Sequence, residues 1–203
     1  AFIATKDGYI DLNPNAGKDQ EGFADVAAGL KFVAFEHKAT GILVTPGFTF
    51  EVDVGEHQVF QGNGDGLLRP FVSVAWDPSS VPELNVVANV GFSLPMDSAH
   101  ETQSLDYHGH VSYEVAPGVM PLVEIHGITY TRNAKALAVG FEGGDLINLG
   151  ASGVAGQTVV TGAVGARFRV NDGLQFGIAW GVPLSDRQDL FKSRLTIDAS
   201  ITF

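Results

Sequence analysis

The stretch LFKSRLTIDASITF, residues 190–203, decides the fold class of this chain. Its residues alternate between an almost wholly apolar set and an almost wholly polar set. The apolar set is Phe191, Ser193, Leu195, Ile197, Ala199, Ile201 and Phe203, and the polar set is Leu190, Lys192, Arg194, Thr196, Asp198, Ser200 and Thr202. A period of two predicts a β-strand with one apolar face. The alternation extends over residues 190–203. An ordinary strand has about 5–6 residues, and a strand that crosses a bilayer needs about 9–11.

Two classes of protein contain such a closing strand: soluble β-sandwiches and transmembrane β-barrels. Terminal residues of a soluble domain are usually polar and poorly ordered, whereas this stretch ends on the aromatic Phe203. We therefore favour the barrel and keep the sandwich as the alternative.

Composition limits the classes of function. The chain has 203 residues, which suits a single domain over residues 1–203, and a formal net charge of −11 at pH 7. An acidic protein is an unsuitable nucleic-acid partner, because phosphate binding needs basic side chains. The absence of cysteine excludes disulfides and thiolate metal sites. No apolar run approaches the roughly 18–20 residues of a membrane helix, whereas the signal of a barrel strand is weaker.

The alternation recurs along the chain and predicts about ten strands with almost no helix. The segments are 1–12, 22–37, 42–54, 69–77, 85–95, 105–115, 119–132, 157–170, 174–184 and 190–203. Pro46 lies inside the third segment and cannot donate a ladder hydrogen bond, so we expect a bulge or a break there.

The connections between these segments alternate in length. The short ones are 38–41, 78–84, 116–118 and 171–173, and the long ones are 55–68 and 133–156. Alternate connections of an up-and-down sheet lie at the same end, so tight turns gather at one end and long loops at the other. Transmembrane barrels show this asymmetry, and their closure satisfies every backbone group. The predicted fold is an all-β, antiparallel, up-and-down transmembrane barrel of about ten visible strands, or about twelve if an N-terminal hairpin is missing.

The two faces of the strands differ as the outside and the lumen of a barrel would. Valine, leucine, isoleucine and phenylalanine occupy one face, and Gly, Ala, Ser and Thr with scattered charges occupy the other. We expect Trp76, Trp180 and Phe203 on the apolar face at the membrane interfaces.

The densest group of ionisable residues is DYHGHVSYE, residues 106–114. A period of two places four of its side chains on one face, and the next strand adds two more, which predicts a lumen-facing polar cluster. Its members are Asp106, His108, His110, Glu114, Glu124 and His126. His-x-His on a strand suits metal binding, and His-x-His-x3-Glu is the core of the cupin motif. Thr102 stands where that motif has glycine, so we favour lumen residues that bond to one another and to water, with no metal.

Basic residues predict an opposite wall of the lumen. They are Arg167, Arg169, Lys192 and Arg194, and Glu51 and Asp53 are acidic counterparts. Opposed walls either create a transverse field across a pore or pair and plug it. The GNGDG run, residues 62–66, is only faintly similar to a calcium loop, and we expect a flexible loop. No nucleophile elbow, P-loop or dinucleotide fingerprint is present, so we expect neither an enzyme nor a cofactor.

Three stretches resemble a family of outer-membrane proteins. They are GFADVAAGLKF at 22–32, GARFRVNDGLQFGIAWGVPLSDRQDL at 165–190, and the closing RLTIDASITF. The family is known as the MetA pathway of phenol degradation group of proposed transporters. The resemblance implies a Gram-negative outer-membrane barrel with both termini periplasmic, passing small hydrophobic or aromatic compounds. It also implies further strand sequence before residue 22 than is present here.

The resemblance implies partners as well. These are the lipid bilayer with its lipopolysaccharide and the barrel-assembly machinery, which would read Ile201 and Phe203 as its signal. Asp198 stands where the family often has glycine. Three functions stay open: a channel for small molecules, a non-transporting barrel that anchors or contacts other proteins, and a soluble cupin-like metal-binding protein.

Overall fold

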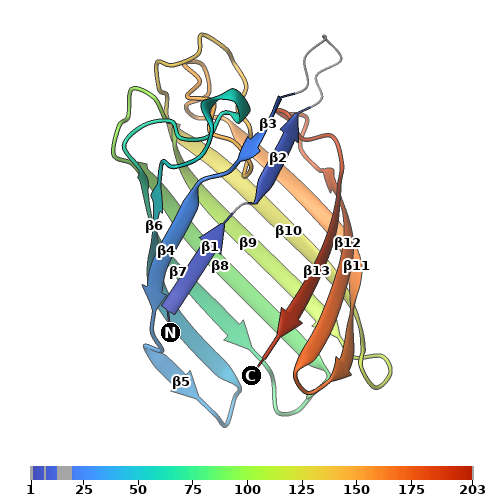
Figure 1. Ribbon diagram of the computed structural model, residues 1–203. Helices are drawn as coiled ribbons and strands as arrows, with labels where there is room; N and C mark the ends of the chain where they lie inside the picture. Colours follow the sequence, from blue (N-terminus) through green and yellow to red (C-terminus); the bar gives the residue numbers. More distant parts are fainter. Residues whose placement is uncertain (1, 7, 13–19, 203) are drawn as a thin grey trace.

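The computed structural model describes residues 2–6, 8–12 and 20–202 and shows one large curved antiparallel sheet together with a small two-stranded one (Figure 1). Ten of its described strands follow one another along the hydrogen-bonded path. They are β1 (Phe2–Lys6), β4 (Val26–Lys31), β6 (Ile42–Val52), β7 (Leu67–Trp76), β8 (Leu84–Pro95), β9 (Gln103–Tyr113), β10 (Val119–Arg132), β11 (Thr158–Asn171), β12 (Leu174–Pro183) and β13 (Arg194–Ile201).

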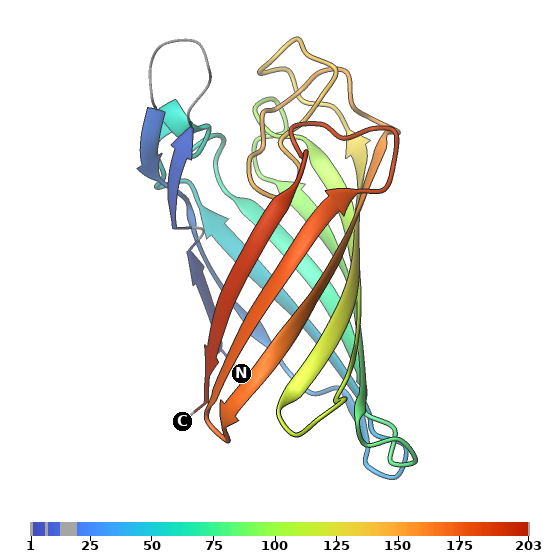
Figure 2. The same ribbon diagram turned by 90° about the vertical axis from the view of Figure 1, so that its right-hand side faces the viewer.

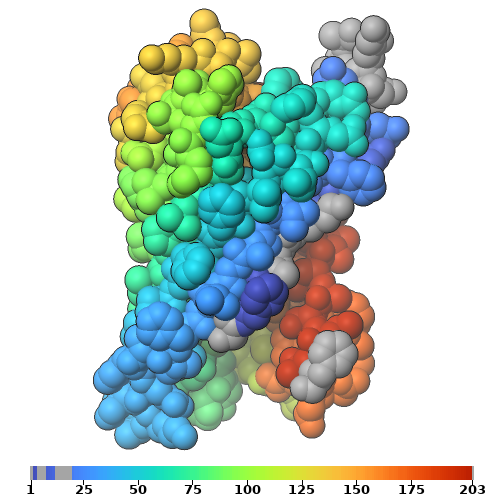
Figure 3. All heavy atoms as spheres, turned by 60° about the vertical axis from the view of Figure 1, so that its left-hand side comes forward, coloured from blue at the N-terminus to red at the C-terminus, as the bar shows by residue number. Residues whose placement is uncertain are grey.

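From β6 onward each strand pairs with its neighbour in sequence, so the sheet is an up-and-down barrel (Figure 2). The connections 53–66, 96–102, 133–157 and 184–193 lie at one end, called here the loop end, and the tight turns lie at the other, the turn end. The predicted fold class is confirmed. The N-terminal strands face the C-terminal ones across the open edge of the sheet (Figures 1 and 3), and no hydrogen bond between β1 and β13 joins the two edges within the described residues.

The first two predicted strands are each broken. Segment 1–12 contains β1 and β2 (Tyr9–Leu12), and segment 22–37 overlaps β3 (Gln20–Phe23) and contains β4 and β5 (Phe35–His37). The strands β2 and β3 form a separate hairpin above the barrel wall. The described part of the chain contains no helix with the length and apolar character needed to cross a membrane.

The closing strand is shorter than predicted, because β13 begins at Arg194. Residues 190–193 belong to the preceding loop, where Phe191 N donates to the Gln188 carbonyl at 2.9 Å and Asp189 has a φ of 49°. Asp189 also accepts a hydrogen bond from Tyr130 Oη at 2.8 Å. These loop contacts keep residues 190–193 out of the strand, although their alternation of apolar and polar side chains continues that of β13. Phe203 lies outside the described residues.

The irregularity predicted at Pro46 occurs on its partner strand. Pro46 itself lies within β6 and pairs with Val72 in an unbroken register with β7. On the other side Lys31 pairs with Gly47 and Phe35 pairs with Val44, so the partner advances four positions while β6 advances three. The extra residue is a bulge that separates β4 from β5.

The two faces of the barrel wall differ as predicted, which β12 shows clearly. Its apolar residues Phe176, Ile178, Trp180 and Val182 are exposed, whereas Gly177 and Gly181 between them are buried. A Cβ on Gly177 would lie 2.2 Å from Asp198 Oδ2, so glycine leaves room for that carboxylate inside the barrel.

The buried apolar core lies at the loop end rather than in the middle of the barrel. It consists of residues from β10, the 133–157 loop and β11, namely Ile128, Tyr130, Ala151, Val154 and Val159, with Val139 packed against them. The core therefore fixes the long 133–157 loop onto the barrel mouth.

Candidate functional site: the barrel lumen and its mouth

Described residues line two cavities that lie inside the barrel toward the loop end. The first has a volume of about 370 Å³ and is lined mainly from β4, β6, β7, β9 and loops, and the second has a volume of about 270 Å³ and is lined mainly from β10 to β13. The same five residues line both: His108, His126, Ile128, Gly144 and Asp145. Strand residues and the tip of the 133–157 loop thus form a partition between two spaces of the lumen.

The strand part of the partition is a pair of stacked histidines. His108 of β9 and His126 of β10 occupy opposite positions of the antiparallel ladder, and their rings stack with centroids 3.9 Å apart and planes at 10°. His108 Nε2 also lies 3.3 Å from Asp106 Oδ2. The register therefore brings together three members of the predicted polar cluster.

Arg69 completes this group across an intervening strand. Its guanidinium donates from Nε to Asp106 Oδ1 at 3.0 Å and from Nη2 to Asp106 Oδ2, and Nη2 also reaches Asn89 Oδ1 at 3.2 Å. A Cβ on Gly91 would lie 2.5 Å from Nη2, so this glycine lets the arginine cross β8. The sequence alone does not single out Arg69, because a partner two strands away has no fixed spacing in sequence.

The other members of the predicted cluster make contacts of their own, although Glu124 also lines the second cavity beside His108 and His126. His110 Nδ1 contacts Glu124 Oε1 at 2.8 Å. Glu114 follows the end of β9 and accepts a hydrogen bond from Gly118 N at 2.8 Å, with Arg169 Nη2 at 3.3 Å. The six residues therefore form three groups along the barrel axis.

Three residues of the predicted basic wall form separate ion pairs, which is one of the two arrangements expected for opposed charges. Arg167 contacts Asp198 at 3.0 Å, Arg169 contacts Glu114, and Arg194 contacts Asp145 at 2.6 Å. Lys192 is exposed in the loop before β13 and does not belong to a strand.

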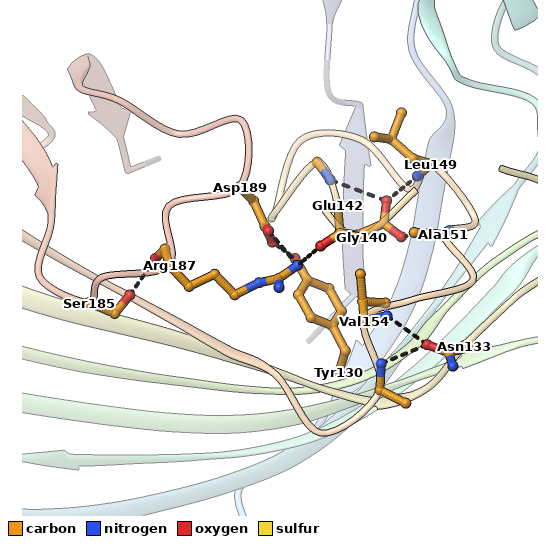
Figure 4. A network of polar contacts seen from close by, with 12 residues as sticks. Tyr130, Asn133, Gly140, Glu142, Leu149, Ala151, Val154, Ser185, Arg187 and Asp189 are labelled. Carbon is orange, nitrogen blue, oxygen red and sulfur yellow. Dashed lines mark hydrogen bonds and ion pairs between the residues drawn. The ribbon is translucent and has the colours of Figure 1, made fainter. Parts of the chain in front are cut away.

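Glu142 organises the 133–157 loop from within. Its side chain is almost fully buried and accepts backbone hydrogen bonds from Gly143 N at 3.2 Å, Ala151 N at 3.1 Å and Leu149 N. Burial raises the pKa of Glu142, and the backbone donors oppose that shift because they stabilise the carboxylate. Asn133 closes the base of the loop by accepting from Val154 N at 2.7 Å (Figure 4).

Contacts with neighbouring loops hold the 133–157 loop across the mouth. Arg187 of the 184–193 loop donates to the Gly140 carbonyl at 2.9 Å and contacts Asp189 at 2.6 Å (Figure 4). On the opposite side Asn148 Nδ2 donates to the Thr102 carbonyl at 3.1 Å. The loop tip is therefore positioned by the surrounding loops as well as by its own strands.

The first cavity is markedly acidic. Its ionisable lining residues are Asp25, Glu51, Glu101, Asp106, Asp145, Arg69, His108 and His126. The sequence identified Glu51 as acidic but did not single out Asp25 and Glu101, because both lie between strands and reach the lumen only through the folding of their loops. Within the part of the chain that the structure describes, no three His, Cys, Asp or Glu side chains are grouped so as to hold a metal ion.

Comparison with known proteins supports the fold. The structure is similar to that of the NanC porin in a rhombohedral crystal form, with a TM-score of 0.61 and 9% sequence identity, over 100% of this chain and 92% of the porin. At this identity the likeness shows the fold alone, a porin-like β-barrel. No family model and no curated protein matches the sequence, so the resemblance to the MetA phenol-degradation family is not confirmed.

Proposed function

We propose that this protein is an outer-membrane channel for small polar solutes, with the turn end and both termini in the periplasm. The porin-like fold supports this proposal, as does the continuous apolar exterior of the strands. An exposed apolar face of this extent is typical of a lipid contact.

The two tryptophans agree with a membrane-spanning orientation. Trp76 is the last residue of β7, at the turn end, and Trp180 lies near the loop end of β12. Both are exposed, and tryptophan is enriched at the two membrane interfaces. A lipid-spanning barrel would place the four connections of the loop end on the lipopolysaccharide side.

The observation that carries the channel proposal is the partition shared by the two lumen cavities. The stacked His108 and His126 face the loop tip at Gly144 and Asp145, and these groups line the space on both sides. A passage narrowed by a folded loop and lined with charged residues selects solutes by size and charge. The acidic lining favours polar solutes, and the hydrophobic or aromatic permeant implied by the family resemblance stays a prediction.

The non-transporting barrel is the second candidate. The ion pairs along the lumen and the multiple anchors of the 133–157 loop favour it, because paired charges and a fixed loop would close the path. The cupin-like alternative is not favoured, since the sheet is an up-and-down barrel and Glu114 contacts Arg169 rather than the histidines.

The test is conductance in planar bilayers, after a gel mobility shift between unboiled and boiled samples has established the folded barrel. We expect discrete conductance steps. The steps should become larger when His108 and His126 are both replaced by alanine, because the smaller side chains widen the passage at the partition. The matched control is His37→Ala, at an exposed residue of the turn end. Folded protein without conductance in both wild type and double variant would reject the channel and leave the plugged barrel.

A further inference from the structure

Glu101 places a deeply buried carboxyl group in the wall of the first cavity. It lies in the connection between β8 and β9, lines the cavity and is only 5% exposed. Its Oε2 atom is buried and has no hydrogen-bond partner among the described residues. Leaving such an atom unpaired is unfavourable, so a ligand that brings a hydrogen-bond donor to this position would be stabilised.

The negative charges around Glu101 favour a hydrogen-bond donor that is positively charged. Burial and, to a smaller extent, the nearby carboxyl groups of Glu51, Asp25, Asp53 and Asp97 together raise the pKa of Glu101 to about 8. Asp25 is already occupied, because it accepts hydrogen bonds from the backbone N–H of Gly55 at 2.7 Å and of Gly62 at 3.0 Å. A cation with N–H donors would satisfy both the unpaired atom and the excess of negative charge.

We propose that the first cavity binds an organic cation through a primary ammonium or guanidinium group, with Glu101 as its anionic partner. This site names a solute class for the proposed channel. It rests on the proposed function, because it treats the first cavity as part of the solute path.

The lining favours an organic cation over a metal ion. The described carboxylates surround the cavity without grouping into a metal-ligand set. Phe60, Leu67 and Ile147 supply apolar lining for a carbon chain, and a volume of about 370 Å³ is within the range of small-molecule sites. A bound cation also favours the carboxylate form of Glu101, so binding releases a proton near neutral pH.

The experiment is isothermal titration calorimetry of the folded protein in detergent with 1,4-diaminobutane. Neutral 1,4-butanediol and anionic succinate are size-matched probes. We expect the diamine alone to bind, and Glu101→Gln to weaken its binding by about tenfold or more, as for loss of a charge-assisted hydrogen bond. Glu83→Gln makes the same chemical change at an exposed turn-end residue and should leave the affinity unchanged.

Unchanged affinity in Glu101→Gln overturns the proposal, as does equal binding of succinate or binding of calcium chloride without the diamine. Wild-type titrations in two buffers of different ionisation enthalpy give a second measurement that needs no variant, and absence of proton release at pH 7 also overturns it. Calorimetry is independent of conductance, so a folded barrel that binds the diamine without conducting would reject the channel and retain the site.

Discussion

The guanidinium of Arg194, the first residue of β13, donates two hydrogen bonds to the carboxylate of Asp145 in the 133–157 loop, at 2.7 and 2.6 Å. Asp145 lines both lumen cavities, so this pair sets the position of the loop tip beside the stacked histidines. It joins two segments that lie 49 residues apart in sequence. Both side chains keep about a third of their surface exposed, so solvent screens the pair.

Replacing Asp145 by asparagine should alter the channel more than it alters stability. Loss of a partly exposed ion pair lowers the free energy of unfolding by about 1 kcal/mol or less. The loop tip loses its bidentate anchor and Arg194 is left with an uncompensated charge in the lumen. We expect noisier single-channel conductance and a reversal potential in asymmetric potassium chloride that shifts toward anion selectivity.

Two controls test the cause of that shift. Asp186→Asn removes the same charge from an exposed position on the 184–193 loop and should leave the selectivity unchanged. Adding Arg194→Gln to Asp145→Asn restores the charge balance and should reverse most of the shift. An equal shift in Asp186→Asn would mean that general surface charge, rather than the loop tip, determines selectivity.

Replacing Glu142 by alanine should loosen the 133–157 loop while the barrel stays folded. The change leaves three backbone N–H donors without their acceptor, each worth about 1–3 kcal/mol if it stays buried. Local unfolding of the loop avoids that loss, so we expect protease cleavage within 137–150 in detergent-solubilised protein. The matched control Glu83→Ala should remain resistant, and resistance of both variants would contradict an organising role for Glu142.

The raised pKa of Glu101 predicts that its contribution to stability falls as the pH rises. The folded protein holds this proton up to about pH 8, whereas the unfolded chain releases it near the ordinary value of 4.5. The contribution is therefore complete below about pH 4.5 and is lost progressively up to about pH 8, by an amount on the order of a few kcal/mol.

Urea unfolding in detergent at pH 5 and pH 9 measures this effect as the difference in free energy of unfolding between the wild type and Glu101→Gln. Glu101→Gln should gain stability relative to wild type on going from pH 5 to pH 9, because the amide does not ionise. Glu83→Gln should follow the wild type at both values. A constant difference between wild type and Glu101→Gln across the pH range would show that the folded protein does not perturb this carboxyl group.

The two tryptophans should report contact with lipid from opposite ends of the barrel. In vesicles of brominated phospholipid we expect fluorescence quenching in both single-tryptophan variants, Trp76→Phe and Trp180→Phe. Bromine near the headgroups should quench more than bromine near the bilayer centre, since both residues lie near strand ends. The unquenched control carries Phe141→Trp, on the 133–157 loop, as its single tryptophan, with both Trp76 and Trp180 replaced by phenylalanine. Weak quenching in both single-tryptophan variants would argue against a membrane-spanning orientation.

Several features of the fold could be predicted from local pattern alone. Alternation over residues 119–132 predicted β10 to the residue, and that over 174–184 predicted β12 to within one residue. The alternating connection lengths predicted the two ends of the barrel. These features follow from the sequence because side chains of a strand alternate between two faces, and one face of a barrel is apolar along its whole length.

The tertiary structure decided which charges meet. Arg69 reaches Asp106 across Gly91, Arg194 reaches Asp145 across the barrel mouth, and Glu101 enters the first cavity from a loop. No local period encodes these contacts, because they depend on the register between strands and on the folding of the 133–157 loop. The sequence by itself therefore determined the wall of the barrel, whereas only the tertiary structure determined the lumen, where residues distant in sequence must satisfy one another's charges.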